Sequence, residues 1–352
     1  RATTGWGSLI ANFKNVQDID TWYVVTLAEK IAGEELNDPE NPDITMSFNT
    51  TIDWYLGLDA SPPAGEFDFV SVALHEIGHG LGYYVQTFEN NGSGEYGRGV
   101  SGVPLIYTKF LEDGDGQNLV GTFDNNSTEL GSALTGNNVF FNSFSFDTTL
   151  PRINAPSEYS TGSSIAHLNE SSYQANNPNS LMTPQLGRAE AIHDPGLALE
   201  MFEDMGWISM HFDHDRLKDT EDLVSSIPVT AVVKGDNAVI ADGIILNYST
   251  NNFATSSSKV MSATANPDEY TTDLPLPGGE VVMSYYIEAN DDEGRNFTTP
   301  GDAPDFFNQF VVAPDTIAPV ILHQPLSLVF VNVGTATIEA QVLDNIGACL
   351  LY

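Results

Sequence analysis

The stretch HEIGHGLGYYV, from His75 to Val85, decides how this chain is interpreted. His75 and His79 are four residues apart, so on a helix they lie on one face about one turn apart, and both imidazoles can reach a single ion. Glu76 lies beside them, where its carboxylate can hold and deprotonate a metal-activated water. The pattern therefore predicts a zinc site with His75 and His79 as ligands and Glu76 as the general base.

The residues around this pattern indicate that the helix is buried. FDFVSVALHEIGHGLG, from Phe67 to Gly82, is mostly apolar, and Asp68 is its candidate N-cap. Burying two histidines and a glutamate is costly unless a metal ion and hydrogen bonds satisfy their polar atoms. Two unrelated histidines on a surface helix are the alternative, and the apolar flanks argue against it.

A catalytic zinc ion normally takes three protein ligands and one water, so a third ligand has to come from elsewhere. Val85 stands where the best-known extended motif has its third histidine. Three other histidines lie in predicted joint or β segments: His211, His214 and His323. That leaves His167 and His193, although a capping or hydrogen-bonding role suits His193, which precedes a helical pattern. A glutamate from a following helix is a further alternative, but Glu89 and Glu95 lie in a Gly- and Asn-rich stretch without helical periodicity.

The stretch SSIAHLNESSYQANNPNSLMTPQL, from Ser163 to Leu186, places His167 ahead of Met182, which lies in a predicted LMTP turn. A helical pattern ending in EDMGW follows. With this combination the chain resembles the metzincin metallopeptidases, and within them the leishmanolysin-like group, from about residue 22 to residue 207. Members of that group have HExxHxxG, a long insertion before the third histidine, a methionine turn beneath the metal and a closing helix.

Carried over position by position, the resemblance implies the following site: His75, His79 and His167 as Zn²⁺ ligands, Glu76 as general base and Met182 as the turn methionine. Gly82 would let the chain leave the active-site helix, and Val85 would be no defect, because the third ligand follows the insertion. Stretches such as PAGEFDFVSVALHEIGHGLGY and INAPSEYSTGSSIAHL also look like secreted metallopeptidases of marine Bacteroidetes. The resemblance thus implies a secreted or cell-surface bacterial zinc endopeptidase that hydrolyses protein or peptide substrates.

The charge of the chain bears on its partners. It has 12 Lys+Arg against 48 Asp+Glu and a formal net charge of -36, which repels nucleic acid phosphates and anionic lipid surfaces. No apolar run is long enough to predict membrane insertion. The acids are scattered, which favours a solvated acidic surface over additional Ca²⁺ sites. EDGDGQN, at Glu112 to Asn118, has the Asp-x-Asp-Gly pattern of a calcium loop, yet Asn118 stands where an EF-hand needs Gly, so a hairpin turn is favoured.

Near residue 210 the local patterns change from helix-length segments to short strands separated by turn residues. The length of 352 residues suggests two or three domains. We expect an α+β metzincin-like zinc peptidase domain at residues 1–210. Short strand patterns separated by turn residues then predict an all-β immunoglobulin- or fibronectin-III-like sandwich at residues 211–314. The candidate strands are IPVTAVVKG, IILNYST, KVMSATA, EYTTDLPL, VVMSYYIEAND and FFNQFVV. Residues 315–352 predict the start of a second, truncated β module.

Within the first domain, three segments have clear local patterns. DTWYVVTLAEKIAGEEL, from Asp20 to Leu36, has apolar residues at helical spacing and Asp20 as candidate N-cap. DITMSFNT, from Asp43, predicts a strand. HDPGLALEMFEDMGW, from His193 to Trp207, predicts a helix capped by Asp194.

The ends of the chain and its single cysteine add two expectations. The sequence begins RATTGW, without an initiator Met or a signal region, and ends inside a strand pattern, so a fragment is expected. Cys349 is the only cysteine, which excludes an internal disulfide. An alternative function is a surface adhesion or carbohydrate-binding protein with an inactive zinc domain. The β modules favour it, whereas an inactive homologue has no chemical need for Glu76.

Overall fold

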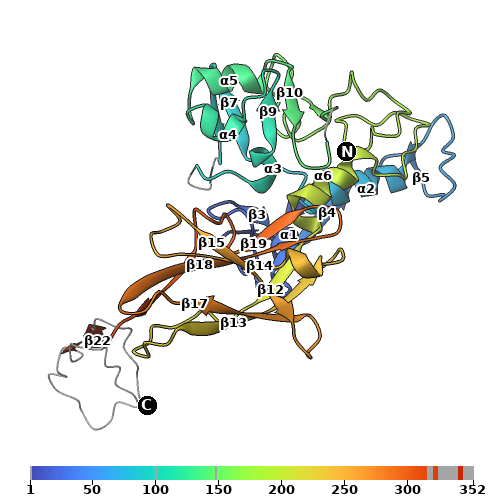
Figure 1. Ribbon diagram of the computed structural model, residues 1–352. Coiled ribbons are helices and arrows are strands. Elements are labelled where there is room, and N and C mark those ends of the chain that lie inside the picture. The colour runs from blue at the N-terminus through green and yellow to red at the C-terminus, as the bar shows by residue number, and fades with distance from the viewer. Residues whose placement is uncertain are drawn as a thin grey trace, which may run out of the picture. The chain divides into compact units, whose positions relative to one another are not determined.

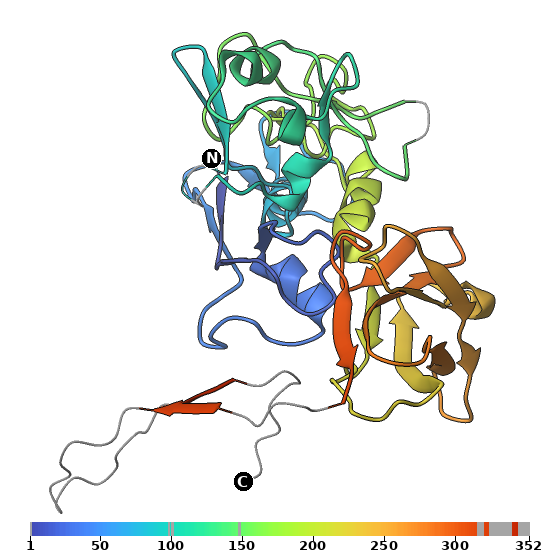
Figure 2. The ribbon, with the colours of Figure 1, turned by 60° about the vertical axis from the view of Figure 1, so that its left-hand side comes forward.

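The computed structural model describes residues 2–97, 99, 102–146 and 149–314 and two short strands at 320–323 and 340–343. These residues form two compact units (Figures 1 and 2). Unit 1 holds the described residues of 1–211 together with 235–237, and unit 2 holds those of 212–234 and from 238 onward. The fold is mixed, with sheets and few helices. No helix in the described ranges combines the length and apolar character that crossing a membrane requires.

Unit 1 has small sheets around a helical centre. Its strands are β1 (Ala2–Trp6), β2 (Leu9–Ile10), β3 (Tyr23–Val24), β4 (Ile44–Phe48), β5 (Trp54–Tyr55), β6 (Phe67–Asp68), β7 (Thr87–Asn90), β8 (Ser93–Tyr96), β9 (Leu111–Asp113), β10 (Val139–Phe141) and β11 (Arg152–Ile153). Its helices are α1 (Val25–Ala32), α2 (Phe69–Gly80), α3 (Ile106–Lys109), α4 (Leu119–Thr122), α5 (Thr128–Leu134) and α6 (Leu197–Phe202), which continues into the π-helical turn η1 (Glu203–Trp207). Pairing is antiparallel in β1–β4, β2–β3, β7–β8 and the sheet β11-β10-β9, and parallel in β5–β6.

The core of unit 1 supports α2, the helix that carries the HExxH pattern. As predicted, α2 begins after Asp68, whose Oδ2 accepts a hydrogen bond from Ser71 N at 2.7 Å. At the other end, Trp207 Nε1 donates to Leu81 O at 3.0 Å, so η1 packs on the end of α2. Gly82, with φ of 121°, turns the chain away from the helix, in a conformation that glycine adopts without strain. Both ends of α2 are therefore held by the fold.

Two predicted helix starts in unit 1 were wrong. Asp20 is not a cap: it has φ of 54° and bonds Asn12, while α1 begins only at Val25. Tyr23 and Val24, which are buried and favour strands, form β3 and pair with β2 instead of continuing the helix. Asp194 is not the cap of α6 either. Gly196 precedes that helix, and Leu197 N is satisfied by Asn179 from a distant segment.

Elsewhere in unit 1, local patterns were reliable. The strand predicted from Asp43 is β4. The stretch from Glu112 to Asn118 forms the predicted turn, with an antiparallel bridge between those two residues. Inside the turn, Asp113 Oδ1 accepts hydrogen bonds from Asp115 N and Gln117 N, each at 2.9 Å. One carboxylate thus accepts two of the backbone hydrogen bonds of this short loop.

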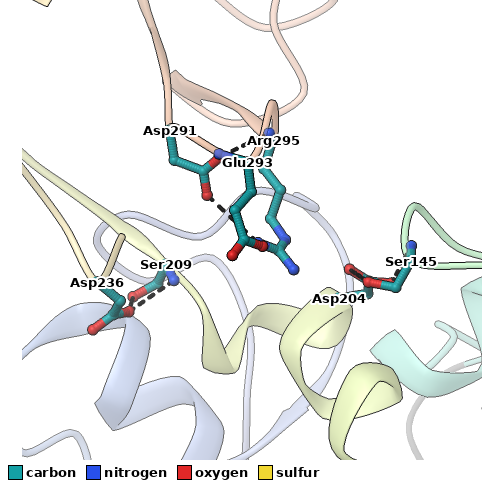
Figure 3. Close-up of polar contacts among 7 residues, drawn as sticks. All are labelled: Ser145, Asp204, Ser209, Asp236, Asp291, Glu293 and Arg295. Atoms are coloured by element: carbon teal, nitrogen blue, oxygen red, sulfur yellow. Dashed lines mark hydrogen bonds and ion pairs between the residues drawn. The ribbon is translucent and has the colours of Figure 1, made fainter. Parts of the chain in front are cut away.

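Asp204 and Asp236 anchor the segment that ends unit 1 (Figure 3). In η1, Asp204 accepts from Ser145 N at 2.8 Å and from Ser145 Oγ at 3.0 Å. Asp236 Oδ2 accepts from Ser209 N at 2.8 Å and Ser209 Oγ at 2.9 Å, and it pairs with Lys30 at 2.6 Å. Burial raises the pKa of Asp236, but Lys30 and Ser209 outweigh it and lower that pKa overall. These bonds explain why residues 235–237 belong to unit 1 although the residues on either side belong to unit 2.

Unit 2 contains two larger sheets, whose strands are β12 (Met210–Asp213), which begins in unit 1, β13 (Ser226–Gly235), β14 (Ile245–Ser249), β15 (Ser257–Val260), β16 (Ser262–Ala263), β17 (Glu269–Pro275), β18 (Val281–Asn290), β19 (Asn296–Thr299) and β20 (Asn308–Val312). A short 3-10 turn, η2 (Ala241–Gly243), precedes β14. One sheet has the order β12-β13-β17-β16 and the other the order β15-β14-β18-β19, with β20 also paired to β18. Alternate residues of β13 are buried: Val229, Ala231 and Val233.

Two features of unit 2 differ from the strand prediction. KVMSATA, predicted as one strand, divides at the buried Met261 into the end of β15 and the start of β16, which lie in different sheets. β19 was not predicted. It follows a turn in which Arg295 N donates to Asp291 Oδ1 at 2.8 Å and Arg295 pairs with Glu293 at 2.7 Å (Figure 3).

Only a small part of the predicted third segment is described. β21 (Val320–His323) pairs antiparallel with β22 (Ala340–Leu343). The rest of residues 315–352, including Cys349, lies outside the described residues, so the second β module stays a prediction.

Candidate metal centre

His75 and His79 project from the last two turns of α2, as their spacing predicts. Their Nε2 atoms are 3.1 Å apart. The structure brings His167, from the segment after β11, to the same point, with its Nε2 atom 3.2 Å from His79 Nε2. The three ligand atoms all lie within 4.8 Å of one another. His167 is 6% exposed and the other two rings are half-buried, so the three rings line the floor of a cavity rather than an open surface.

The opposite nitrogen of each ring settles the tautomer. Each Nδ1 faces a backbone carbonyl: His75 faces Leu181 O at 2.8 Å, His79 faces Tyr83 O at 2.7 Å and His167 faces Ser163 O at 2.9 Å. A carbonyl oxygen only accepts hydrogen bonds, so each Nδ1 has to carry the hydrogen. In the neutral rings, all three Nε2 lone pairs then point at one another. Such an arrangement is unfavourable unless a cation lies among them, which is the role expected of metal-binding histidines held by carbonyls.

Burial keeps these rings uncharged near neutral pH. Desolvation is the largest cause that lowers the pKa of all three rings. The neighbouring imidazoles also lower the pKa of His79 and of His167, because a charge on one ring disfavours a charge on the next, and the pKa of His79 falls to about 4 in all. Since only neutral imidazole binds a metal, the site needs little proton release to accept one.

We expect the metal-free protein to lose stability as the pH falls from about 6.5 toward about 4. The unfolded chain takes up a proton at His79 near its ordinary pKa of 6.5, whereas the folded chain does so only near a pKa of about 4. The stability present above the unfolded pKa is therefore lost between these two values. Thermal unfolding of chelator-treated protein, followed across this range, measures the loss.

Carboxylates also titrate in acid, so the informative control is His79→Gln, which removes the titrating ring. Its loss of stability across the same window should be shallower than that of the parent protein. Equal slopes in the two proteins would contradict the assignment of His79 as a buried neutral ring.

A turn beneath α2 supports the three rings. Thr183 N donates to Ser180 O at 3.1 Å, which closes the turn around Met182. Met182 is fully buried and its sulfur lies against Gly78 of the HEIGH sequence, where an added Cβ would be only 2.8 Å away. Met182 O also accepts from Leu168 N at 2.8 Å, next to His167. The predicted methionine turn thus touches both chain segments that carry the histidines.

Glu76 lies beside the rings at the wall of a cavity of about 710 Å³. Its side chain is 7% exposed, and its Oε2 accepts a hydrogen bond from Thr4 Oγ1 at 2.7 Å. The three histidines line the same cavity. The rest of the wall is largely apolar and aromatic, and includes Trp54, Phe67, Tyr84, Val85, Tyr159 and Leu186. A carboxylate and three imidazoles therefore line one cavity with mainly apolar walls.

The other candidates from the sequence lie away from the three rings. His193 Nε2 is 2.8 Å from Asp68 Oδ2, so His193 bonds the N-cap of α2 at the opposite end of the helix. Glu89 lies in β7 and Glu95 in β8, the two strands of one hairpin, and neither joins the cluster of ligand atoms. A second acidic group, formed by Glu29, Glu35 and Asp43, lies elsewhere in unit 1 and is half-exposed.

The sequence alone does not indicate the contributions of the backbone and of the first strand to the site. The carbonyls that orient the rings belong to Ser163, Leu181 and Tyr83, and a carbonyl has no sequence signature. Thr4 was also missed, because its contact with Glu76 joins residues 72 positions apart. The first residues have no alternating pattern that would have indicated this contact.

No protein-family model matches this chain, and no curated protein matches it significantly.

Proposed function

We propose that the chain is a zinc-dependent endopeptidase, with a leishmanolysin-like metzincin domain in unit 1 and an immunoglobulin- or fibronectin-III-like sandwich in unit 2. One observation carries the proposal. Three neutral imidazoles direct their Nε2 lone pairs at one point, beside a buried carboxylate, at the wall of a cavity. A structural metal site would have no use for the cavity or for Glu76.

The donor set fits zinc. Imidazole nitrogens suit Zn²⁺, and three protein ligands with an open fourth position are typical of catalytic rather than structural zinc sites. His75, His79 and His167 would hold the ion. When bound, zinc would act as a Lewis acid toward a substrate carbonyl and make a water molecule acidic.

Glu76 would perform the proton transfers. Its carboxylate takes a proton from the water that attacks the scissile carbonyl, as the oxygen–carbon bond forms. It then returns that proton to the nitrogen of the leaving amine, as the carbon–nitrogen bond breaks. The buried position of Glu76, next to three uncharged rings, keeps competing bulk water away from the reacting atoms.

The cavity suits a polypeptide substrate. Its walls are mainly apolar and aromatic, and such walls favour side chains of a protein over phosphates or other strongly hydrated groups. The net charge of -36 also disfavours nucleic acid. We further propose a secreted or cell-surface location, which rests on the sequence resemblance alone.

Clearing of casein or gelatin in the presence and absence of a zinc chelator tests this proposal. We expect clearing by the purified protein, loss of clearing with 1,10-phenanthroline and recovery on adding Zn²⁺ at a stoichiometric level. Clearing that resists the chelator would overturn the zinc mechanism. A folded, zinc-loaded protein that clears neither substrate would instead favour the alternative, in which the zinc domain is inactive and unit 2 binds a surface or a carbohydrate.

A further inference from the structure

We infer that Thr4, on the first strand of unit 1, is a positioning residue for Glu76. The inference rests on the proposed function, since it assigns Thr4 a role in the reaction of that same site. It adds a residue outside the histidine, glutamate and methionine motifs, and it makes the strand β1 part of the active centre.

The fold places Thr4 against α2. β1 pairs antiparallel with β4, and Thr4 is opposite Met46 in this register. Ala2, Thr3 and Thr4 all line the cavity that contains the histidines. The backbone pairing with β4 fixes the height of Thr4 along the cavity wall, so its side chain reaches α2 at the level of Glu76.

The hydroxyl group of Thr4 contacts two oxygens of the same residue. Thr4 Oγ1 is 2.7 Å from Glu76 Oε2 and 2.8 Å from the Glu76 backbone oxygen. The hydroxyl thus lies within hydrogen-bond distance of both the carboxylate and the backbone oxygen of Glu76, and its single hydrogen is donated to one of them at a time. A glutamate side chain otherwise has several rotamers of similar energy, and fixing one of them before substrate binds removes that cost from the reaction.

Two acceptors also let the hydroxyl serve Glu76 in both of its states during turnover. When the carboxylate is ionised, Thr4 Oγ1 donates its single hydrogen to Glu76 Oε2. When a proton resides on Oε2, that group can donate to Thr4 Oγ1, which turns its own hydrogen to the Glu76 backbone oxygen. A hydroxyl is both donor and acceptor, so it can make either bond without moving.

Three variants separate this role from simple packing. Thr4→Val keeps the shape and removes the hydroxyl, and Thr4→Ser keeps the hydroxyl and removes the methyl group. Thr45→Val makes the same change at an exposed position of the neighbouring β4 and serves as the matched control. Each protein is assayed for kcat and KM on one fluorogenic peptide and for zinc content.

In Thr4→Val we expect kcat to fall at least about tenfold with KM nearly unchanged, because misplacing a catalytic group by about 1 Å can cost about a hundredfold. Thr4→Ser should keep kcat within about threefold of the parent, and Thr45→Val should behave like the parent. Zinc content should be equal in all four proteins. A loss of kcat in Thr4→Ser as large as in Thr4→Val would show that the methyl group matters rather than the hydroxyl, and would overturn the inference.

Crystal structures of the two Thr4 variants provide a readout that does not depend on activity. The Glu76 carboxylate should leave its position in Thr4→Val and keep it in Thr4→Ser. An unmoved Glu76 in Thr4→Val would overturn the inference even if the enzyme is active. If the parent protein cleaves no peptide, the proposed function fails, while the two crystal structures still decide whether Thr4 positions Glu76.

Discussion

Glu76→Gln is expected to lose at least about a hundredfold in kcat while it keeps its metal, a loss on the scale of general acid–base catalysis. The amide has the size of the carboxylate, and its oxygen can still accept the hydrogen bond from Thr4 Oγ1. It cannot accept a proton from the attacking water at ordinary pH. Peptide cleavage rates and zinc content, measured on the same preparation, separate loss of chemistry from loss of the site.

An exposed glutamate provides the control for this change. Glu129 lies in the first turn of α5, and Glu129→Gln should have the parent activity. Activity of Glu76→Gln equal to that of the parent would refute the proposed role of Glu76. Loss of zinc together with activity would mean that Glu76 has a structural part in holding the rings.

His167→Ala should lose more than about a hundredfold in zinc affinity, since a change in an outer-shell partner alone costs about 10- to 100-fold. The variant removes one of three converging Nε2 atoms and leaves His75 and His79 as the remaining ligands. His193→Ala is the matched control, because it is the same substitution at a half-buried histidine of unit 1 that lies away from the three rings. Competition with a weak chelator, followed by metal analysis of both proteins, measures the difference.

The two variants should also differ in which property they lose. His193 Nε2 is 2.8 Å from Asp68 Oδ2, so its loss weakens the N-cap of α2 and should lower thermal stability with zinc affinity nearly unchanged. If His193→Ala loses zinc while His167→Ala retains it, the three-histidine site is wrong, whatever the activity of either protein.

The third histidine of the site could not be chosen from the sequence alone. From the residues alone, His167 and His193 both remained open, and only the resemblance to leishmanolysin-like enzymes favoured His167. In the structure, His167 meets His75 and His79, while His193 meets Asp68. Both are reached from distant points of the chain, and no local pattern distinguishes a histidine that approaches one end of α2 from one that approaches the other.

Helix starts show the same limit. The start of α2 was predictable, because Asp68 caps it through a residue three positions away. The start of α1 was not, because pairing with β2 converts its expected first turn into β3. The start of α6 was not either, because the amide of Leu197 is satisfied by Asn179 rather than by a neighbouring side chain. A cap supplied by a neighbouring residue can be predicted from the local sequence, whereas a cap supplied by a distant segment cannot.

The sequence by itself determined the pair of histidines and the glutamate beside them, since these follow from spacing within one helical turn. The predicted burial of their helix holds only in part, because Glu76 is buried whereas the large apolar side chains of α2 are half-buried. Only the tertiary structure decided which lone pairs converge. The bond from His75 to Leu181 O joins residues 106 positions apart, and that from Thr4 to Glu76 joins residues 72 positions apart. Such contacts depend on how separate segments pack. The contact of His75 also involves a backbone carbonyl, which every residue possesses and no sequence pattern can single out.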